Sequence, residues 1–253
     1  MSDRMKSIVF ALMLCLVCSS LLTAASTLLQ PMQEKNFQID RKKNILRSVS
    51  LIEPGRKYSN DEIEKLYKDN IFQYYVDGKG TIVSPETVEN PELSGLLPLY
   101  LAMDANNRIR SYIIPVESNG LWGKIHGYMA LKDDGATIEG FTVYKHSETP
   151  GLGGEIENQW FQENFVGKKI VNPENQFVAV SIAKGSAADK VTKEKLPNYV
   201  DGISGATLTG QYLTQGLHRI LKKYEPVSLN FRQNALQCRM QTHEPWCEEN
   251  AHE

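Results

Sequence analysis

The alternation of apolar and polar residues divides the chain into an apolar N-terminal segment and a long segment of mixed character. Residues 7–33 carry no charge, and residues 8–25 are almost entirely apolar. A helix of about 20 such residues crosses the ~30 Å hydrocarbon core of a bilayer. We therefore predict a transmembrane anchor over residues 1–33. A cleaved secretory signal is the alternative, because Thr23-Ala24-Ala25 resembles a cleavage site, although the uncharged run continues past it.

Residues 34–97 are predicted to form a helical linker or subdomain. The anchor helix can continue with a polar face through residues 33–49, and Pro54-Gly55 then ends it. Ser59 or Asn60 caps a second helix, whose apolar face is formed at spacings of three and four by Ile63, Leu66 and Tyr67.

Residues 98–226 combine a run of strands with a few helices. Alternating apolar positions predict strands over 99–103, 110–117, 127–132, 136–144 and 177–183. Asp133-Asp134-Gly135 is a hairpin signal between two of them. A short helix is expected over 157–165. Because the strands follow one another instead of alternating with helices, we predict an α+β fold with a mostly antiparallel sheet flanked by helices, preceded by one N-terminal transmembrane helix.

The last predicted helix, over 206–224, has a polar start and an apolar stripe. Thr207 and Thr209 fall on its first turn, where both hydroxyls would face a bound phosphate, and basic residues close its C-terminal end. The stripe consists of Leu208, Tyr212, Leu213, Leu217, Ile220, Leu221 and Tyr224.

The composition is that of an ordinary globular protein. The chain has 253 residues, of which 41% are hydrophobic and 23% charged, and its formal net charge is −2. This length allows one large domain or two small ones. No basic run with interleaved aromatic residues occurs, so we expect no nucleic-acid partner.

The charges that flank the apolar segment leave its orientation open. Arg4 and Lys6 precede the segment, and a larger basic group follows it: Lys35, Arg41, Lys42, Lys43 and Arg47. A literal count of positive charges places the large domain in the cytoplasm. A short tail before a single span is also the form of a signal-anchor, and long domains translocate largely regardless of charge.

The cysteines form two pairs. Cys15 and Cys18 lie in the apolar segment, where they are most simply small hydrophobic residues. Cys238 and Cys247 lie in a polar C-terminal tail over residues 227–253. A disulfide is expected for this second pair if the tail is extracytoplasmic, and free thiols are the alternative. Metal binding together with His243 and His252 is a third alternative, although the spacing matches no recognised zinc pattern.

Residues 201–210, Asp-Gly-Ile-Ser-Gly-Ala-Thr-Leu-Thr-Gly, carry the clearest chemical signal. Small residues let a ligand approach the backbone closely. The start of a helix offers unpaired N–H groups and the positive end of its dipole to a phosphate. A simple helix N-cap by Ser or Asp after a glycine turn is the alternative interpretation.

Two further glycine-framed stretches stand out. Residues 146–155, His-Ser-Glu-Thr-Pro-Gly-Leu-Gly-Gly-Glu, leave a predicted strand and form either a long turn or a loop that lays main-chain groups against a flat ring. Trp122, between Gly120 and Gly123, either covers such a ring or fills the core. His126 and His146 are expected to be structural or surface residues.

Taken in order, these motifs resemble a known family. Leu-Trp-Gly at 121–123, a strand hairpin, Glu-Thr-Pro-Gly-Leu-Gly at 148–153 and Asp-Gly-x-Ser-Gly-Ala-Thr at 201–207 are similar to the covalent-flavin domain. That domain occurs in the C subunit of the sodium-translocating NADH:quinone oxidoreductase and in the G subunit of the Rnf complex. Gly-Leu-Gly-Gly-Glu at 151–155 and the Leu-Thr after Thr207 look closer to the former. With the N-terminal span, the resemblance covers most of the chain up to about Pro226.

The resemblance implies that a flavin transferase attaches FMN through a phosphoester to the hydroxyl of Thr207. Thr209 is the other hydroxyl on the same turn, about 200° around the helix. Asp201 assists the attachment or forms a turn, and Ser204 hydrogen-bonds the phosphate or caps the helix. We expect no metal site. The predicted cofactor-binding residues are Thr207, Ser204, Gly205, Ala206, Asp201, Leu208, Glu148, Thr149, Gly151, Leu152, Gly153 and Trp122.

The function that the resemblance implies is electron transfer from NADH toward ubiquinone, coupled to sodium export. The expected partners are the other subunits of the six-subunit enzyme, the flavin transferase and membrane lipid. No dinucleotide-binding fingerprint occurs in the chain, so NADH and quinone are expected to bind other subunits. The implied location is the cell inner membrane, with one span and a periplasmic main domain. The alternatives are a G-type Rnf subunit, a module that holds free FMN or another phosphate ligand without redox activity, and a purely structural anchored domain.

Overall fold

The computed structural model describes residues 2–53, 55–88, 90, 94–104 and 108–233, which form two compact units over 1–41 and 42–253. Helix α1 (Asp3–Ser48) makes up the first unit and ends in the second. Its apolar N-terminal part is long and apolar enough to cross a membrane, and the side chains there are exposed. A continuous helix over the predicted anchor and its polar extension is therefore confirmed.

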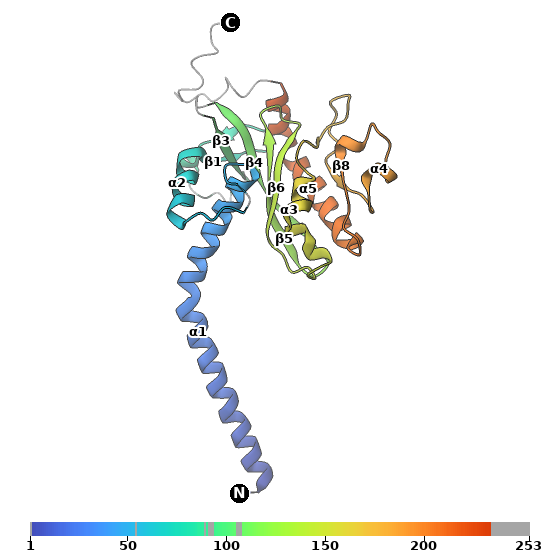
Figure 1. Cartoon of the computed structure of the whole chain (residues 1–253). Coiled ribbons are helices and arrows are strands. Elements are labelled where there is room, and N and C mark those ends of the chain that lie inside the picture. The colour runs from blue at the N-terminus through green and yellow to red at the C-terminus, as the bar shows by residue number, and fades with distance from the viewer. Residues whose placement is uncertain (1, 54, 89, 91–93, 105–107, 234–253) are drawn as a thin grey trace. The chain divides into compact units, whose positions relative to one another are not determined.

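The second unit is built on a six-stranded sheet with the order β2-β1-β3-β4-β5-β6 (Figure 1). Every neighbouring pair in it is antiparallel, which confirms the predicted α+β fold. Asp133-Asp134-Gly135 joins the last two strands as the sequence predicts. The strands are β1 (Ile71–Val76), β2 (Ile82–Val83), β3 (Leu97–Met103), β4 (Ile109–Asn119), β5 (Lys124–Lys132) and β6 (Ile138–Lys145).

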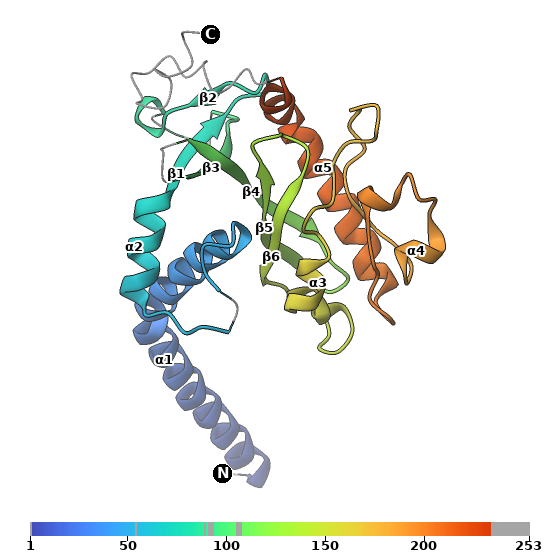
Figure 2. The same ribbon diagram turned by 45° about the horizontal axis from the view of Figure 1, so that its top comes forward.

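Both faces of the sheet are covered, because its side chains alternate between two apolar layers. Tyr112, Ile114 and Val116 of β4 face the core beneath α5 (Thr207–Arg232), whereas Ile113 is buried on the opposite side. The end of α1 covers that opposite side, since the Asn44 carbonyl accepts a hydrogen bond from Thr142 Oγ1 at 3.3 Å. Figure 2 shows α5 on one side of the strands and the end of α1 on the other.

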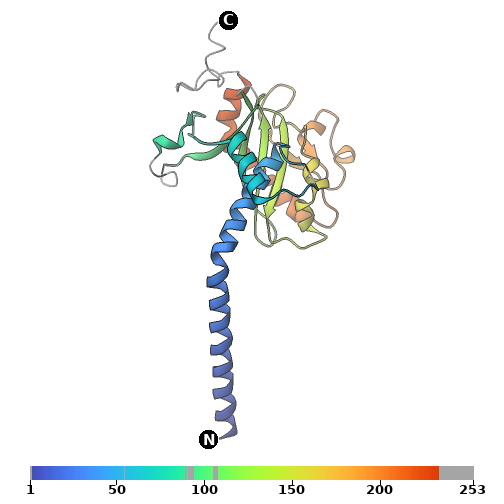
Figure 3. The same cartoon turned by 60° about the vertical axis from the view of Figure 1, so that its left-hand side comes forward.

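Smaller elements complete the second unit. α2 (Asn60–Asn70) is capped by Ser59, one of the two predicted caps, in a capping box with Glu62 that was not predicted from the sequence. The others are α3 (Gln159–Glu163), α4 (Ala187–Lys190), the parallel strands β7 (Ser181–Ile182) and β8 (Tyr199–Val200), and three 3₁₀ turns: η1 (Pro85–Thr87), η2 (Gly153–Glu157) and η3 (Leu196–Asn198). Figures 2 and 3 both place the β1–β2 end and the segment around α4 and β8 on opposite sides of this unit.

The hairpin turn between β5 and β6 is fixed by the carboxylate of Asp134. It accepts hydrogen bonds from the Ala136 and Thr137 N–H groups, both at 2.8 Å, and from the Thr137 hydroxyl at 2.5 Å. Burial raises the pKa of Asp134, but these hydrogen bonds outweigh burial and hold the pKa below its usual value.

Two predictions about the elements are wrong. The predicted helical linker over 34–97 contains β1 and β2, which belong to the main sheet, whereas α1 ends at Ser48, close to the predicted end at residue 49. The predicted strand over 177–183 is reduced to β7, because Ala179 has a positive φ of 61°. The Val178 and Ala179 N–H groups both bond the Ile170 carbonyl there, so the chain turns instead of extending.

The last helix is longer than predicted, and its buried stripe lies further toward the C-terminus. α5 continues through Pro226 to Arg232, because Val227 and Phe231 extend the buried face. The Phe231 ring stacks on Tyr112 with centroids 4.4 Å apart, and packing of this kind outweighs the hydrogen bond that proline removes. Leu208 and Tyr212, both predicted in the stripe, are instead exposed.

Gly216 allows α5 to approach β4 closely. A Cβ at this position would lie 2.0 Å from Ser118 Oγ and 3.0 Å from Ser118 Cα. The Ser118 hydroxyl donates to the Tyr212 carbonyl at 2.9 Å, one turn earlier in the helix. This contact sets how far the helix lies from the sheet and along it.

We predict that Gly216→Ala lowers the free energy of unfolding by roughly 2 kcal/mol, because the extra methyl group forces α5 away from β4. Urea unfolding of the detergent-solubilised full chain measures the change. Gln215→Ala, at the exposed neighbouring position, is the control and should stay within about 0.5 kcal/mol of the parent. Helix propensity alone favours alanine over glycine by about 1 kcal/mol, so a more stable Gly216→Ala variant would contradict the close-packing account.

Candidate functional site

The three motif-bearing segments meet around one buried carboxylate. Glu148, which follows β6, is only 5% exposed. Its Oε1 accepts a hydrogen bond from the Trp122 backbone N–H at 3.0 Å, in the turn between β4 and β5. Its Oε2 accepts one from the Thr209 hydroxyl at 2.5 Å, on the first turn of α5. One side chain thus joins segments that are 26 and 61 residues away in the sequence.

Glycines make room for this carboxylate on both sides. A Cβ on Gly120 would lie 2.4 Å from Glu148 Oε1. A Cβ on Gly153 would lie 2.5 Å from Glu148 Oε2 and 2.6 Å from Thr209 Oγ1. Real Cβ atoms do not approach oxygen this closely, so both positions need glycine for the observed packing. The glycines of the motifs therefore serve contacts within the protein as well as turns.

The 146–155 segment is a turn with an internal hydrogen-bond network. The Leu152 and Gly154 N–H groups both donate to the Thr149 carbonyl, at 3.1 and 2.9 Å. His146 Nδ1 accepts the Glu148 N–H at 3.1 Å, and its Nε2 lies 3.1 Å from Glu157 Oε2. Because Nδ1 accepts, the proton of a neutral His146 is on Nε2, where it is donated to Glu157. His146 is a structural residue of the turn, as expected.

The start of α5 has no side-chain cap. Its N-cap residue is Ala206, and the first helical backbone bond runs from the Gly210 N–H to the Ala206 carbonyl at 3.0 Å. The alternative interpretation, a cap by Ser204 or Asp201, is therefore wrong. Asp201 Oδ1 instead accepts the Ala187 N–H of α4 at 2.7 Å. The first N–H groups of α5 precede that bond and are available to an anion.

The two threonines of the first turn differ completely in exposure. Thr207 is exposed, whereas Thr209 is 2% exposed and hydrogen-bonded to Glu148. The prediction that both hydroxyls face a bound phosphate is therefore wrong for Thr209. The helical period explains the difference, since two residues further on the side chain has turned by about 200° toward the protein.

Apolar side chains are exposed on the three segments that adjoin Glu148 and the start of α5. Trp122 is 68% exposed, Leu208 50% and Leu152 44%. Leu152 lies over the turn before α5, because a Cβ on Gly205 would meet Leu152 Cδ2 at 2.8 Å. Large exposed apolar side chains that gather in one place are typical of a binding surface. The alternative in which Trp122 fills the core is wrong, because most of its surface is in solvent.

The structure thus brings most of the predicted site residues together and separates one of them. The 148–153 turn, Trp122 and the start of α5 from Ser204 to Leu208 adjoin one another through the contacts above, and Asp201 does not face them. Sequence reasoning missed the pairing of Glu148 with Thr209. Gly120 before Trp122 and Gly153 after Leu152 indicated close packing. No sequence pattern showed that the close neighbours are the carboxylate of Glu148 and the hydroxyl of Thr209.

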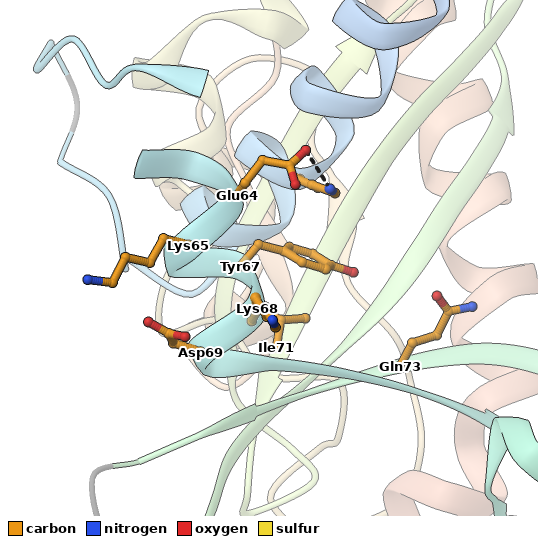
Figure 4. A pocket seen from close by; sticks show the side chains of 8 residues that line it. Glu64, Lys65, Tyr67, Lys68, Asp69, Ile71 and Gln73 are labelled. Atoms are coloured by element: carbon orange, nitrogen blue, oxygen red, sulfur yellow. Dashed lines mark hydrogen bonds and ion pairs between the residues drawn. The ribbon is translucent and has the colours of Figure 1, made fainter. Parts of the chain in front are cut away.

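A cleft on the second unit lies elsewhere. It has a volume of about 660 Å³ and is lined along α2 and the start of β1 by Lys42, Glu64, Lys65, Tyr67, Lys68, Asp69, Ile71 and Gln73 (Figure 4). Lys42 Nζ pairs with Glu64 Oε1 at 2.8 Å in it. None of the predicted site residues lines this cleft. Nor does any cluster of three or more His, Cys, Asp or Glu suited to a metal occur among the described residues. The predicted alternatives for Cys238 and Cys247 lie outside those residues.

Comparison with known proteins identifies the family. The FMN-binding domain family matches residues 120–222, which include all three motif-bearing segments. The C subunit of the Na⁺-translocating NADH-quinone reductase of Haemophilus ducreyi is 34% identical over 220 residues, covering 79% of this chain and 82% of the relative. The same protein of Pseudomonas aeruginosa is 33% identical over 244 residues, covering 86% and 91%. The chain belongs to the family of C subunits of the Na⁺-translocating NADH-quinone reductases.

Solved structures of this family have the same fold. The C subunit from Parabacteroides distasonis superposes with a TM-score of 0.66 at 29% sequence identity, over 79% of this chain and 96% of that one. NqrC from Shewanella oneidensis gives a TM-score of 0.56 at 23% identity, which supports the fold alone. The family assignment confirms the resemblance that the sequence motifs indicate.

The residues at the start of α5 fit a flavin phosphate and ring. The uncapped helix start supplies N–H donors for phosphate oxygens. Gly205, with a positive φ of 74°, lets the backbone turn at that point without a side chain. Exposed Leu152, Leu208 and Trp122 offer apolar contact to a flat ring. Donors, space and apolar surface therefore lie in the same place.

Gly205 and Gly151 form a matched pair for testing this packing. Both have positive φ, of 74° and 73°, but only Gly205 has a neighbour close to an added Cβ. We predict that Gly151→Ala costs about 1 kcal/mol of stability from backbone strain. Gly205→Ala should cost about 1 kcal/mol more, because its methyl group also displaces Leu152.

Thermal unfolding of the two variants, compared with the parent, measures the difference. Equal losses of stability would show that Leu152 does not pack over Gly205.

Proposed function

We propose that this chain is the FMN-carrying C subunit of a Na⁺-translocating NADH:quinone reductase, with the flavin bound as a phosphoester to the hydroxyl of Thr207. It relays electrons on the path from NADH toward ubiquinone, and the complete enzyme couples that transfer to sodium export. The observation that carries the proposal is the exposed Thr207 hydroxyl at the uncapped start of α5.

The start of α5 favours a phosphoester at this position. The phosphodiester formed on Thr207 keeps one negative charge, which the first N–H groups of the helix and its dipole stabilise by about 0.3–1 kcal/mol at an exposed site. Ser204, Gly205 and Ala206 are small and leave the threonine accessible to the transferring enzyme. A bulky or anionic residue before Thr207 would remove one of these advantages.

Attachment requires a donor with a leaving group. The Thr207 oxygen forms a bond to the flavin phosphorus, and its proton passes to a base of the transferase. The phosphoanhydride bond of a flavin dinucleotide breaks at the same time, and a nucleoside monophosphate leaves. No oxidation or reduction occurs in this step. The proposed step does not use Asp201, whose Oδ1 accepts the Ala187 N–H.

The residues of this chain hold and shield the cofactor and provide no further chemistry. FMN supplies one-electron and two-electron transfer when bound. Leu152, Leu208 and Trp122 are proposed to contact the ring, and the 148–153 turn, including Thr149, Gly151 and Gly153, is proposed to form the wall beside it. The other subunits of the six-subunit enzyme are the proposed partners, and NADH and quinone are proposed to bind them.

Two alternatives differ in chemistry. In the first, the same surface holds free FMN or another phosphate ligand without covalent attachment. In the second, the domain is purely structural. The absence of a side-chain cap on α5 and the exposed apolar group around Thr207 favour a ligand over the purely structural role.

Covalent attachment is tested by co-expressing the full chain with a flavin transferase and imaging denaturing gels for flavin fluorescence. Thr207→Ala should remove the fluorescent band, whereas Thr207→Ser should retain it because a hydroxyl remains. Thr209→Ala should also retain the band. Fluorescence that persists in Thr207→Ala, or is lost in Thr209→Ala, would place the attachment elsewhere. A parent chain without fluorescence, with FMN recovered after denaturation, would favour the non-covalent alternative.

The proposed location is the cell inner membrane, with α1 as a single span, lipid around it and the second unit in the periplasm. We predict that an exposed thiol at position 193, introduced by Lys193→Cys in a chain whose own cysteines are serine, reacts with a membrane-impermeant maleimide in intact spheroplasts. The unsubstituted cysteine-free chain is the control. Labelling only after the inner membrane is opened would place the second unit in the cytoplasm.

A further inference from the structure

We propose that Glu148 is a positioning residue that selects between the two threonines of α5. It fixes the 148–153 turn against the helix start and holds Thr209 out of reach, which leaves Thr207 as the acceptor hydroxyl. This inference rests on the proposed function and assigns Glu148 a role different from direct contact with the cofactor. Both carboxylate oxygens of Glu148 bond donors of the protein itself.

Selection is needed because both threonines lie within one turn of the helix. Chemically, Thr209 is the better prepared nucleophile, since its hydroxyl already donates to a carboxylate at 2.5 Å. A hydroxyl bonded in this way to a potential base is the arrangement that activates nucleophiles in enzymes. Thr207 is nevertheless the more accessible of the two, because it is exposed whereas Thr209 is only 2% exposed. Access, therefore, decides between them.

The barrier over Thr209 consists of Glu148 and the backbone of the turn. Gly153 lies so close that a Cβ on it would be 2.6 Å from Thr209 Oγ1. The turn is held there by several bonds: Glu148 to Thr209, Glu148 to the Trp122 N–H, and the Glu148 N–H to His146. A phosphorus atom with its oxygens cannot reach Thr209 Oγ1 while these bonds persist.

The same bonds hold the backbone of Trp122 and the turn that carries Leu152 against the start of α5. The backbone N–H of Trp122 donates to Glu148. Leu152 belongs to the 148–153 turn and lies against Gly205. Loss of the carboxylate leaves the buried Thr209 hydroxyl and the Trp122 backbone N–H without this partner, which favours opening of the turn toward water. Glu148 thereby couples the masking of one hydroxyl to the shape of the surface around the other.

A set of variants separates the effect of the hydrogen bonds of Glu148 from the effect of its negative charge. Glu148→Gln keeps the length of the side chain, and its amide can accept from the Trp122 N–H while its NH₂ donates to Thr209 Oγ1. Glu148→Asp keeps the charge but is one methylene too short to reach both partners. Glu148→Ala removes both bonds. Glu163→Ala, at an exposed glutamate of α3, is the control.

The first measurement is the initial rate of flavin attachment by the transferase to the full-length apo-chain in detergent, at a temperature where thermal unfolding shows every variant folded. We expect Glu148→Gln and Glu163→Ala to remain within threefold of the parent, and Glu148→Ala and Glu148→Asp to fall at least tenfold. A Glu148→Ala rate equal to that of the parent would overturn the proposal. Gln as slow as Ala would assign the effect to charge and would also overturn it.

The second measurement needs no flavin and tests the masking directly. In a full chain whose four natural cysteines are serine, Thr207→Cys and Thr209→Cys place a thiol at each position. We expect a small alkylating reagent to modify the thiol at position 209 at least tenfold more slowly than that at position 207. Adding Glu148→Ala should remove most of this protection, whereas adding Glu163→Ala should not.

The two failures are distinguishable. If the parent chain takes up no covalent flavin, the proposed function fails, while the thiol rates still test whether Glu148 masks position 209. If flavin attaches to Thr207 and the two thiols react equally fast, the masking by Glu148 is wrong, while the proposed function remains.

Discussion

The close packing of α5 on β4 is the constraint on which the other features depend. Gly216 brings the helix against Ser118, and the Ser118 hydroxyl bonds the Tyr212 carbonyl one turn earlier. With this distance fixed, the first turn of the helix lies beside the turn that follows Asn119 and the turn that follows β6. A helix displaced along the sheet by one turn, about 5.4 Å, would bring a different pair of residues to Glu148. The contact between Gly216 and Ser118 thus determines which residues of α5 meet Glu148.

A buried carboxylate at this junction is costly unless all its oxygens are satisfied. Glu148 meets that condition with one backbone N–H and one hydroxyl. These bonds replace part of the hydration that the carboxylate loses, and they use donors from two distant segments. The helical period places the two threonines on opposite sides of the first turn, and the bond to Glu148 holds Thr209 in its buried position. In this account, the hydrogen bonds of Glu148 both stabilise the junction and determine which threonine hydroxyl is available for attachment.

Much of the fold could be predicted from sequence, and the failures have local reasons. Alternating apolar residues predicted β3 to β6, Asp-Asp-Gly predicted the hairpin, and the capping residues Ser59 or Asn60 predicted the start of α2. β1 was missed because Ile71–Val76 carries aromatic residues that are only half-buried and show no clean alternation. The end of α5 was missed because Pro226 is a helix breaker by local rules, whereas the stacking of Phe231 on Tyr112 is a tertiary contact.

The candidate site shows the same division between local and tertiary information. Glycine-rich motifs and their order led to the flavin family and to Thr207, because those features are local and specific. The alternative of a cap by Ser204 or Asp201 was wrong, since Asp201 bonds α4, which no local pattern could indicate. Thr209 was weighed as a competing hydroxyl on geometry alone. Its burial depends on Glu148, a residue 61 positions earlier, and was visible only in the folded structure.

The central claim concerns one atom, the hydroxyl oxygen of Thr207. Fragmentation mass spectrometry of the peptide that contains residues 201–216, taken from the full chain after co-expression with a flavin transferase, locates any added group. The account predicts a mass increase equal to FMN less one water, carried by Thr207 and absent from Ser204 and Thr209. An unmodified peptide, or the same increase on Thr209, would contradict it.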